Sequence, residues 1–381
     1  MNILHLTHTD IKADSRILKE MQSIAKSNKS YNLQGIGIDR REDRNSNSLE
    51  KISIYSLEIK TRKWSIFPKI MKHFFILCEF YTKLLILSLR LKPQIIHCHD
   101  ELVLPIGVFV KILTNSKLIY DAHELESEKN GLTKLESKCI FFIENIIWRF
   151  IDKLIVVSPS IAKWYHEKVG IKDTAIIMNS PFFEKEKISF DKCYLRKTFD
   201  IPPLSRIFIY IGGFTKGRGI ESLIEIFSNK NLKSHVVFLG YGQLKDELLK
   251  ASNININIHV HHAVPHERVI EIAKSADVGL CFIENVSLSD YYCLPNKLFE
   301  YAFSEIPVIT SDFPDIASVV KEYGLGSCSS VDIENIFLTI NKFEVMDKLP
   351  KIKFEELYDL SWAAQEVKLV NLYSELTEVR I

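Results

Sequence analysis

The stretch from Ser287 to Thr310 combines residue types that could bind an anion and a sugar. A polar, aromatic loop leads to Pro295, and proline is favoured at the start of a helix because the first N–H groups there have no intrahelical partner. Apolar residues then recur at helical spacing around Glu300. A helix N-terminus attracts phosphate through its free N–H groups and dipole, whereas a glutamate accepts hydrogen bonds, for example from sugar hydroxyls. The pattern predicts an anion site beside a hydroxyl-binding carboxylate.

A glycine-rich turn is the second candidate for binding phosphate. The apolar run 207–211 predicts a buried strand, Gly212 to Gly219 follow it, and apolar residues from Ile220 onward have helical spacing. Backbone N–H groups can approach a phosphate closely where side chains are missing. Arg218 adds a guanidinium with bidentate geometry for phosphate. A solvated basic turn is the alternative interpretation.

Histidines follow two other predicted strands at the points where these strands end. The run 95–98 leads to His99 and Asp100, and the run 118–120 leads to Asp121 and His123. Ligands of open α/β sheets gather at the carboxyl ends of the strands, so both ends are candidate sites. A structural histidine is the alternative. His97 and His99 by themselves do not predict a zinc site, since no third ligand stands at a recognisable spacing.

The elements that must position these groups are alternating strands and helices. Further strands are predicted at 3–6, 33–38, 52–57, 154–158, 175–178, 235–239, 258–264, 278–282 and 308–310, with a final helix from about 360 to 376. The chain has 381 residues, enough for two domains with full cores. Its formal net charge of +1 gives no general attraction to nucleic acid. Seven cysteines without a paired pattern favour reduced thiols, and we expect a cytoplasmic protein.

The segment 62–92 mixes aromatic and basic residues in a predicted helical stretch. Six aromatic side chains alternate with seven lysines and arginines, and Glu79 is its single acid. A basic amphipathic segment can lie on the anionic inner face of the plasma membrane. A core helix with a solvated basic face is the alternative, and the sequence leaves both open.

These motifs together resemble glycosyltransferase family 4, whose members are retaining sugar transferases. Glu300 matches the second of the family's two donor-site glutamates, and 304–309 matches the "G-x-P-V-I" tail that follows it. His123 matches the histidine that faces the donor sugar, and Arg218 stands at the position of the phosphate-binding lysine. Gly240 and Tyr241 match the strand end near the nucleobase. The resemblance covers nearly the whole chain.

Two positions depart from the family pattern. Tyr292 stands where the first glutamate would be, and Gly213 stands where the family has its phosphate-binding arginine. Lys216 or Lys297 could supply the missing cation. No D-x-D motif is found, so metal-independent transfer is expected, with no cofactor.

The resemblance implies the GT-B fold, an α/β fold with two Rossmann-like domains facing a central cleft and a C-terminal helix crossing back to the first domain. The expected domains are 1–190 with 362–381 for the acceptor and 191–361 for the donor. The resemblance implies two partners. One is a nucleotide-sugar donor, for which a UDP-sugar is expected, and the other is a glycan or lipid-linked acceptor of bacterial surface polysaccharide synthesis. The implied catalytic residues are His123, Arg218 and Lys297; the donor-binding residues are Gly212, Gly213, Lys216, Gly240, Tyr241, Leu294, Asn296, Leu298 and Glu300; the acceptor-side residues are Asp14, Arg16 and His99.

Three other interpretations concern single residues or the whole activity. The loop with Asp14 and Arg16 resembles the family's "D-x-R-v-x-k-E" opening, but Asp14 could equally be a helix cap. Sugar-nucleotide 2-epimerases share the fold and need no acceptor. The missing glutamate and arginine also allow a nucleotide-sugar-binding protein that has lost its activity.

Overall fold

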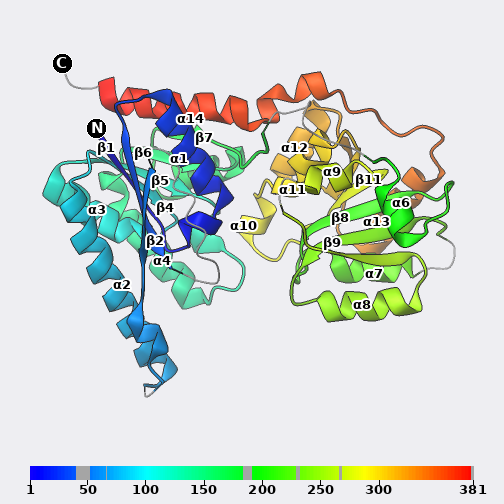
Figure 1. Cartoon of the computed structure of the whole chain (residues 1–381), viewed down its shortest axis with the longest axis horizontal. Coiled ribbons are helices and arrows are strands. Elements are labelled where there is room, and N and C mark those ends of the chain that lie inside the picture. Colours follow the sequence, from blue (N-terminus) through cyan, green and yellow to red (C-terminus); the bar gives the residue numbers. More distant parts are fainter. Residues whose placement is uncertain (40–51, 66, 183–190, 229–231, 266–267, 379–381) are drawn as a thin grey trace. The chain divides into compact units, whose positions relative to one another are not determined.

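The chain folds into two compact units (Figure 1). The computed structural model describes residues 1–381 apart from 40–51, 66, 183–190, 229–231, 266–267 and 379–381. The N-terminal unit comprises Met1–Ile177 and Glu366–Ile381, and the C-terminal unit comprises Met178–Gln365. The domains predicted from the sequence change at 190 and at 361 instead. The sequence also places the linker at 184–197, of which 184–190 lie outside the described residues.

The N-terminal unit is built on a seven-stranded sheet with the order β3-β2-β1-β4-β5-β6-β7. All neighbouring strands run parallel. The order reverses between β1 and β4, and the carboxyl ends of strands at such a switch point are where ligands bind in open α/β sheets. The strands are β1 (Asn2–Leu6), β2 (Asn32–Ile38), β3 (Ile52–Leu57), β4 (Ile95–His99), β5 (Lys117–Ala122), β6 (Lys153–Val156) and β7 (Thr174–Ile176).

Side-chain caps mark where several helices of this unit begin. Asp14 accepts hydrogen bonds from the backbone N–H groups of Arg16 and Ile17 at the start of α1. Thr133 and Glu136 form a reciprocal capping box at the start of α4. The helices are α1 (Ser15–Ser27), α2 (Lys69–Leu91), α3 (Leu104–Thr114), α4 (Lys134–Ile147) and α5 (Pro159–Lys168).

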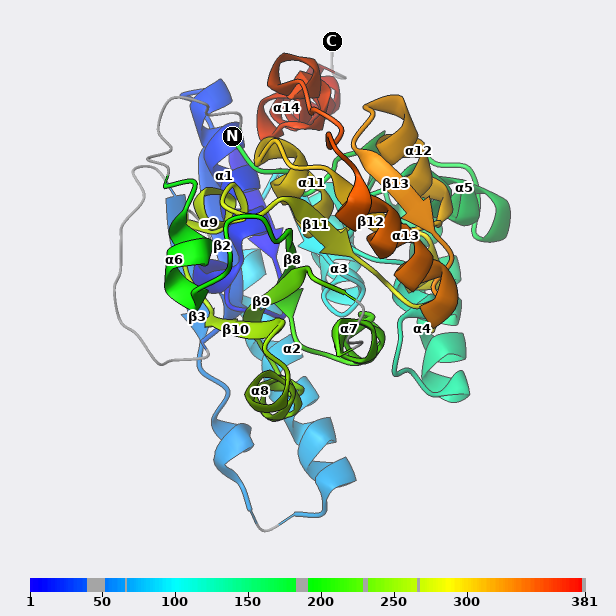
Figure 2. The same cartoon turned by 90° about the vertical axis from the view of Figure 1, so that its right-hand side faces the viewer.

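The C-terminal unit repeats this plan with six strands in the order β10-β9-β8-β11-β12-β13 (Figure 2). Neighbours are again parallel, and the switch point lies between β8 and β11. The strands are β8 (Ile207–Gly213), β9 (His235–Tyr241), β10 (Ile258–His262), β11 (Val278–Cys281), β12 (Val308–Ser311) and β13 (Gly326–Ser329).

Both faces of this second sheet are covered by helices. Along β8, Ile207 and Ile209 belong to one hydrophobic cluster while Phe208 and Tyr210 belong to another. Successive side chains of a strand point to opposite faces, so the two clusters are the cores on the two sides of the sheet. The helices are α6 (Tyr194–Phe199), α7 (Ile220–Phe227), α8 (Lys245–Ile254), α9 (Val269–Ala273), α10 (Leu288–Tyr291), α11 (Asn296–Phe303), α12 (Pro314–Glu322) and α13 (Ile333–Val345).

The last helix, α14 (Trp362–Glu378), begins in the C-terminal unit and continues into the N-terminal unit from Glu366 onward. In the N-terminal unit the Tyr373 hydroxyl lies 2.7 Å from Nδ1 of His97 on β4. The C-terminal helix therefore returns to the first domain, as the resemblance implies.

Two parts of the structure differ from the sequence-based elements. The strands predicted from the sequence do not include Gly326–Ser329, which pairs with β12 as the edge strand β13. The segment 62–92 is not one helix, since a 3₁₀ turn (Lys60–Lys63) precedes α2, which begins at Lys69 after Pro68. Within the described ranges, no helix has both the length and the apolar content needed to span a bilayer.

Candidate active site

A group of polar side chains is buried at the carboxyl ends of β1, β4 and β5. We call it the buried polar cluster, and apart from His123 its side chains are almost completely enclosed. Helix α1 contributes two members, because positions four residues apart lie on the same helix face. The cluster consists of His5, Arg16, Glu20, His97, His99, Asp121 and His123.

Arg16 is the fixed cation of the buried polar cluster. Its guanidinium donates to Asp121 Oδ1 at 3.0 Å and to the backbone carbonyl of Ile177 at 3.0 Å. Its Nε also lies 3.1 Å from Oε1 of Glu20. The predicted acceptor-side residue Arg16 is therefore enclosed within the N-terminal unit, and it neutralises buried carboxylate charge there.

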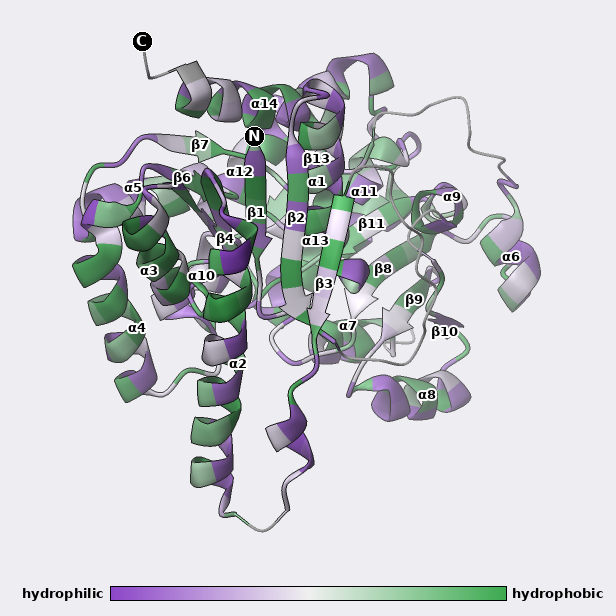
Figure 3. Ribbon diagram, turned by 60° about the vertical axis from the view of Figure 1, so that its left-hand side comes forward, coloured by the Kyte–Doolittle hydropathy of each residue, from purple (hydrophilic) through white to green (hydrophobic). Residues whose placement is uncertain are grey.

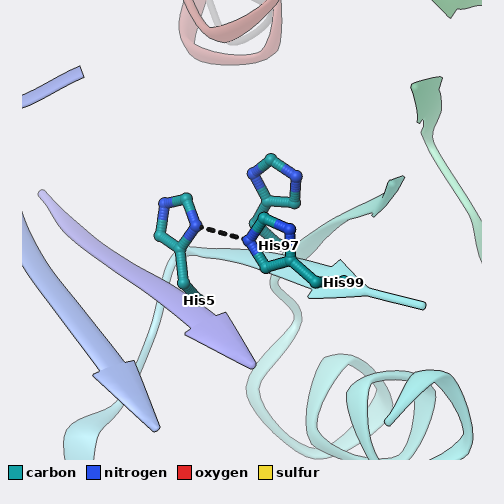
Figure 4. Close-up of side chains that lie close together, drawn as sticks. All are labelled: His5, His97 and His99. Carbon is teal, nitrogen blue, oxygen red and sulfur yellow. Dashed lines mark hydrogen bonds between the residues drawn. The ribbon is translucent and has the colours of Figure 1, made fainter. Parts of the chain in front are cut away.

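The histidines form a connected chain of rings (Figure 4). Nδ1 of His5 lies 2.9 Å from Nε2 of His99, and Nδ1 of His99 lies 3.1 Å from Nε2 of His123. His97 and His99 are two residues apart on β4, so they face the same side of the sheet and their rings stack 4.3 Å apart. His5 is paired with His97 on the neighbouring strand β1. The predicted residues His99 and His123 are thus brought together.

Opposite protonation states are favoured within this cluster. Burial lowers the pKa of His97 to about 3, and it also lowers the pKa of His99. Burial likewise disfavours the charged form of His123, but Asp100 and Asp121 outweigh it and raise the pKa of His123 to about 9. Burial and then Asp121 raise the pKa of Glu20 to about 8. An imidazolium at His123 therefore lies beside neutral imidazoles at neutral pH.

His123 lies between two carboxylates at the edge of the cluster. Its Nε2 is 3.2 Å from Asp121 Oδ2, and its Nδ1 is 3.6 Å from Asp100 Oδ1. Asp100 follows β4 with a φ of 66°, a left-handed conformation that aspartate tolerates better than most residues. A charged, partly exposed imidazole at this place could donate a hydrogen bond or stabilise negative charge.

The glycine-rich turn of the C-terminal unit leaves its backbone uncovered. A Cβ added to Gly212, whose φ is +128°, would meet no heavy atom within 4 Å, and one on Gly213 would first meet Thr215 at 3.9 Å. Gly240 at the end of β9 differs, since its Cβ would lie 1.9 Å from the Gly212 carbonyl oxygen. Glycine at 240 lets β8 and β9 pack together, while the open glycines at 212 and 213 permit a ligand to approach the backbone.

Two cations flank this turn. Arg218 is 36% exposed, and its Nη1 lies 3.0 Å from Oδ1 of Asp290 on α10. The Lys297 ammonium lies 3.9 Å from the ring centroid of Tyr210 on β8. Its Nζ is buried and has no hydrogen-bond partner among the described residues. A buried ammonium with unused donors can bind an anion without first breaking protein hydrogen bonds.

The other predicted donor-site residues fall into two groups. Lys216, Tyr241 and Asn296 are exposed, Tyr241 at the end of β9 and Asn296 as the first residue of α11. Pro295 is the cap residue immediately before the helix. The side chains of Leu294 and Leu298 lie in the hydrophobic core, and Glu300 is 6% exposed one turn into α11.

Three neighbours of these residues were not among the sequence-based candidates. Glu20 belongs to the buried polar cluster, Tyr373 contacts His97 of this cluster, and Asp290 pairs with Arg218. The spacing of Arg16 and Glu20 by four residues is a signal that the sequence does contain. Tyr373 is 276 residues away from His97 in the chain, and no local pattern connects them.

Comparisons with known families agree with the motifs. Residues 194–352 match the family model "Glycosyl transferases group 1", and residues 44–180 match "Glycosyltransferase Family 4". A chitobiosyldiphosphodolichol beta-mannosyltransferase of Kluyveromyces lactis is 25% identical over 368 residues, covering 84% of this chain and 77% of that protein. The O-antigen biosynthesis glycosyltransferase WclY of Escherichia coli is 27% identical over 196 residues, half of each chain.

Solved structures share the fold over the full length. The sucrose-phosphate synthase of Thermosynechococcus elongatus superposes with a TM-score of 0.80 at 16% identity, covering 100% of both chains. HepE of Anabaena, solved in complex with UDP-glucose, superposes with a TM-score of 0.73 at 13% identity, covering 98% of this chain and 100% of that one. With two doubly wound parallel sheets and both family models matched, the chain has the GT-B fold and belongs to the family 4 glycosyltransferases.

Proposed function

We propose that this glycosyltransferase moves a sugar from a nucleoside diphosphate sugar to a glycan or lipid-linked acceptor, with retention of configuration and without a metal ion at the diphosphate. The observation that carries the proposal is the open glycine turn with Arg218 and Lys297 beside it. A departing nucleoside diphosphate gains negative charge, which cations already held in place stabilise. We assign this role to these two side chains and to the first N–H groups of α11.

The remaining roles are assigned by the chemistry of the side chains. We propose that Glu300, on α11, accepts hydrogen bonds from the ribose hydroxyls. We propose His123 as the catalytic group of the N-terminal unit, because its imidazolium is partly exposed and held by two carboxylates. Both assignments follow the family positions that these residues occupy in the sequence.

We propose a UDP-sugar as the donor and bacterial surface polysaccharide synthesis as the pathway. HepE was solved with UDP-glucose bound, and WclY is named for O-antigen biosynthesis. The yeast relative is named for a dolichol-linked substrate, which supports a lipid-linked acceptor. These relatives support the proposal by their similarity to this chain.

A thermal-shift experiment tests the donor site. Wild type is melted with UDP-, GDP- and CMP-sugars, with and without EDTA, and compared with Glu300→Gln. A ligand that binds only the folded state raises the melting temperature by mass action. We expect the UDP-sugars to stabilise wild type regardless of EDTA, and to stabilise Glu300→Gln less. Glu305→Gln, which changes an exposed glutamate paired with Lys274, is the control and should respond as wild type does.

Three outcomes would count against parts of this proposal. No shift with any nucleotide would contradict the donor site. A shift that disappears with EDTA would contradict metal-independent binding. Conversion of the donor sugar without any acceptor would favour an epimerase over a transferase.

We also propose a peripheral contact with an anionic membrane, on the inner face of the plasma membrane, through 62–92. The beginning of α2 extends away from the sheet of its unit, and hydrophobic and hydrophilic residues alternate along its ribbon (Figure 3). Ile70 is 86% exposed and Phe74 is 62% exposed. Exposed apolar residues flanked by Lys69 and Lys72 fit a surface of anionic lipid.

Vesicle sedimentation tests the membrane contact. We expect wild type to bind vesicles that contain phosphatidylglycerol more strongly than pure phosphatidylcholine vesicles, and salt to weaken this binding. Phe74→Asp should reduce the bound fraction. Leu204→Asp, at a fully exposed leucine of the C-terminal unit, is the matched control. Equal binding by both variants would contradict the assignment of this surface.

A further inference from the structure

Four metal-ligating side chains from three elements converge inside the N-terminal unit. Glu20 comes from α1, His97 and His99 from β4, and Asp121 from β5. All four are fully buried. One ligand atom from each lies within 4.8 Å of the corresponding atom of every other residue. The third and fourth ligands that the histidine spacing in the sequence lacks are thus supplied by the fold.

The distances between the ligand atoms of this group approach those between the ligands of a tetrahedral zinc ion. His97 Nε2 lies 3.8 Å from Glu20 Oε2 and 3.6 Å from Asp121 Oδ2. His99 Nδ1 lies 4.0 Å and 3.3 Å from the same two oxygens. Tetrahedral zinc with bonds of about 2.0–2.2 Å holds its ligand atoms roughly 3.3–3.5 Å apart. The remaining pairs of ligand atoms lie within 4.8 Å of each other, so all four atoms would have to move closer together to complete such a site.

Two of these ligand atoms lack a hydrogen-bond partner among the described residues. Glu20 Oε2 and His97 Nε2 are buried and make no hydrogen bond with any described residue. Leaving a buried polar atom unpaired costs about 1–3 kcal/mol, and such atoms are a sign of an ion or water that belongs there. Both atoms belong to fully buried side chains; they lie 3.8 Å apart, and His97 Nε2 lies 3.6 Å from Asp121 Oδ2.

The surrounding groups hold each ligand by its other atom. His97 Nδ1 lies 2.7 Å from the Tyr373 hydroxyl, and His99 Nε2 lies 2.9 Å from His5 Nδ1. In each ring the nitrogen facing away from the carboxylates is hydrogen-bonded, and in His99 the Nδ1 also lies 3.1 Å from His123 Nε2. Metal-binding histidines are commonly oriented in this way by a hydrogen bond to the second ring nitrogen.

Charge and ligand type narrow the choice of cation. Arg16 contacts Glu20 Oε1 and Asp121 Oδ1, and it offsets the charge of one of the two carboxylates. Its Nη2 also lies 3.3 Å from Asp121 Oδ2, so a bound cation would replace this longer contact. Two imidazoles with two carboxylates suit Zn²⁺ and similar transition metals, whereas Mg²⁺ and Ca²⁺ prefer oxygen ligands only. His123 competes for the same atoms, since its Nε2 lies 3.1 Å from His99 Nδ1.

We propose that Glu20, His97, His99 and Asp121 form a binding site for one divalent transition-metal ion of the Zn²⁺ class. The ion would join α1 to the ends of β4 and β5, and by binding His99 and Asp121 it would release His123 from both. The site lies wholly within the N-terminal unit, so it is separate from the metal-independent donor site proposed for the C-terminal unit.

Cobalt titration of the full-length protein tests this site without any assay of transferase activity. The protein is first stripped with EDTA, dialysed and then titrated with Co²⁺. We expect one equivalent to produce the strong visible absorption of four-coordinate cobalt, and Zn²⁺ to abolish it by displacement. Glu20→Gln and His97→Gln should lose this absorption, with circular dichroism used to verify that each variant is folded.

A milder variant and a control keep the test decisive. Tyr373→Phe removes only the support of His97, and it should weaken Co²⁺ binding about 10–100-fold without abolishing it. His235→Gln alters a partly buried histidine pair in the C-terminal unit, where His235 Nδ1 lies 2.9 Å from His259 Nε2, and this variant should bind Co²⁺ as wild type does. No four-coordinate cobalt spectrum in wild type, or the same spectrum in folded Glu20→Gln, would overturn the proposal, leaving protons to compensate the buried carboxylates.

Discussion

The candidate groups of the N-terminal unit bond to one another inside the protein, whereas those of the C-terminal unit surround a turn that is open. The Arg16 side chain is 4% exposed and lies against two buried carboxylates. The Arg218 side chain is 36% exposed and has one carboxylate partner. The two arginines carry the same charge, but only the second is accessible to a ligand from solvent.

This difference indicates what each unit contributes. Buried, paired charges fix the positions of side chains at the cost of desolvation, so they serve to hold a neighbouring group such as His123 in one state. Accessible cations beside uncovered backbone can exchange water for a phosphate. Substitutions in the first unit should therefore alter stability, and substitutions in the second should alter ligand binding.

The largest expected effect follows from removing a charge inside the N-terminal unit. Asp121→Asn leaves the guanidinium of Arg16 buried without its main counter-charge. Breaking one partner of a buried pair costs about 3–5 kcal/mol, and we expect a loss of this size in the free energy of unfolding measured with urea. Arg218→Gln breaks a pair whose arginine is 36% exposed and whose Asp290 keeps a hydrogen bond from Ser287, so it should cost less than Asp121→Asn. Equal losses in both variants would remove the distinction between the units.

A second expectation concerns pH and the buried carboxyl of Glu144 on α4. Burial raises its pKa to about 7, although hydrogen bonds from Tyr165 and Tyr120 oppose this; Glu101 raises the pKa further and Lys129 lowers it. The folded state therefore keeps a proton that the unfolded state, with a pKa near 4.5, has released. The unfolding free energy should fall by up to about 3 kcal/mol as the pH rises from about 4.5 through about 7.

Glu144→Gln should flatten this dependence, because glutamine does not titrate. Urea unfolding of the variant and of wild type at about pH 5 and about pH 8 measures the difference. Glu167→Gln on α5 replaces an exposed glutamate and serves as the control, with the slope of wild type. A wild-type slope that persists in Glu144→Gln would show that other groups cause it.

In the C-terminal unit the expected effect is on binding. Arg218→Gln removes a charged donor, and hydrogen bonds to charged groups contribute about 1.5–3 kcal/mol. We expect the dissociation constant for the stabilising nucleotide-sugar, measured by calorimetry, to rise by about 10–100-fold. Arg268→Gln, which breaks an exposed pair with Glu271, should leave the constant unchanged. An unchanged constant in Arg218→Gln would mean that the turn does not hold the diphosphate.

The sequence predicts most of the strands because they are short apolar runs that end in polar residues. Strand β13 was missed because its residues, Gly-Ser-Cys-Ser, lack the β-branched and aromatic side chains that favour strands. It becomes a strand by pairing with β12 along the sheet edge. Pairing with β12 makes this segment a strand, and the intrinsic strand propensity of its residues does not.

The candidate site is predictable to the extent that it follows strand ends. His99, His123 and the glycine turn were found in this way, since the carboxyl ends of parallel strands converge. The residues that set the charge states of these side chains could not be found from the strand ends. Asp290 belongs to no recognised motif, and although Glu20 ends the "D-x-R-v-x-k-E" pattern, its contact with His97 arises only from the fold.

The smallest expected effect separates two interpretations of Asp14. Its carboxylate accepts hydrogen bonds from two N–H groups at the start of α1, at 3.1 and 3.2 Å, so it is a helix cap. Asp14→Ala should cost about 1 kcal/mol in unfolding free energy, whereas Asp14→Ser should restore most of this because serine also caps helices. If the carboxylate also serves the acceptor, Asp14→Ser regains stability but its KM for the acceptor stays raised. If Asp14 is a cap alone, stability and KM recover together in Asp14→Ser.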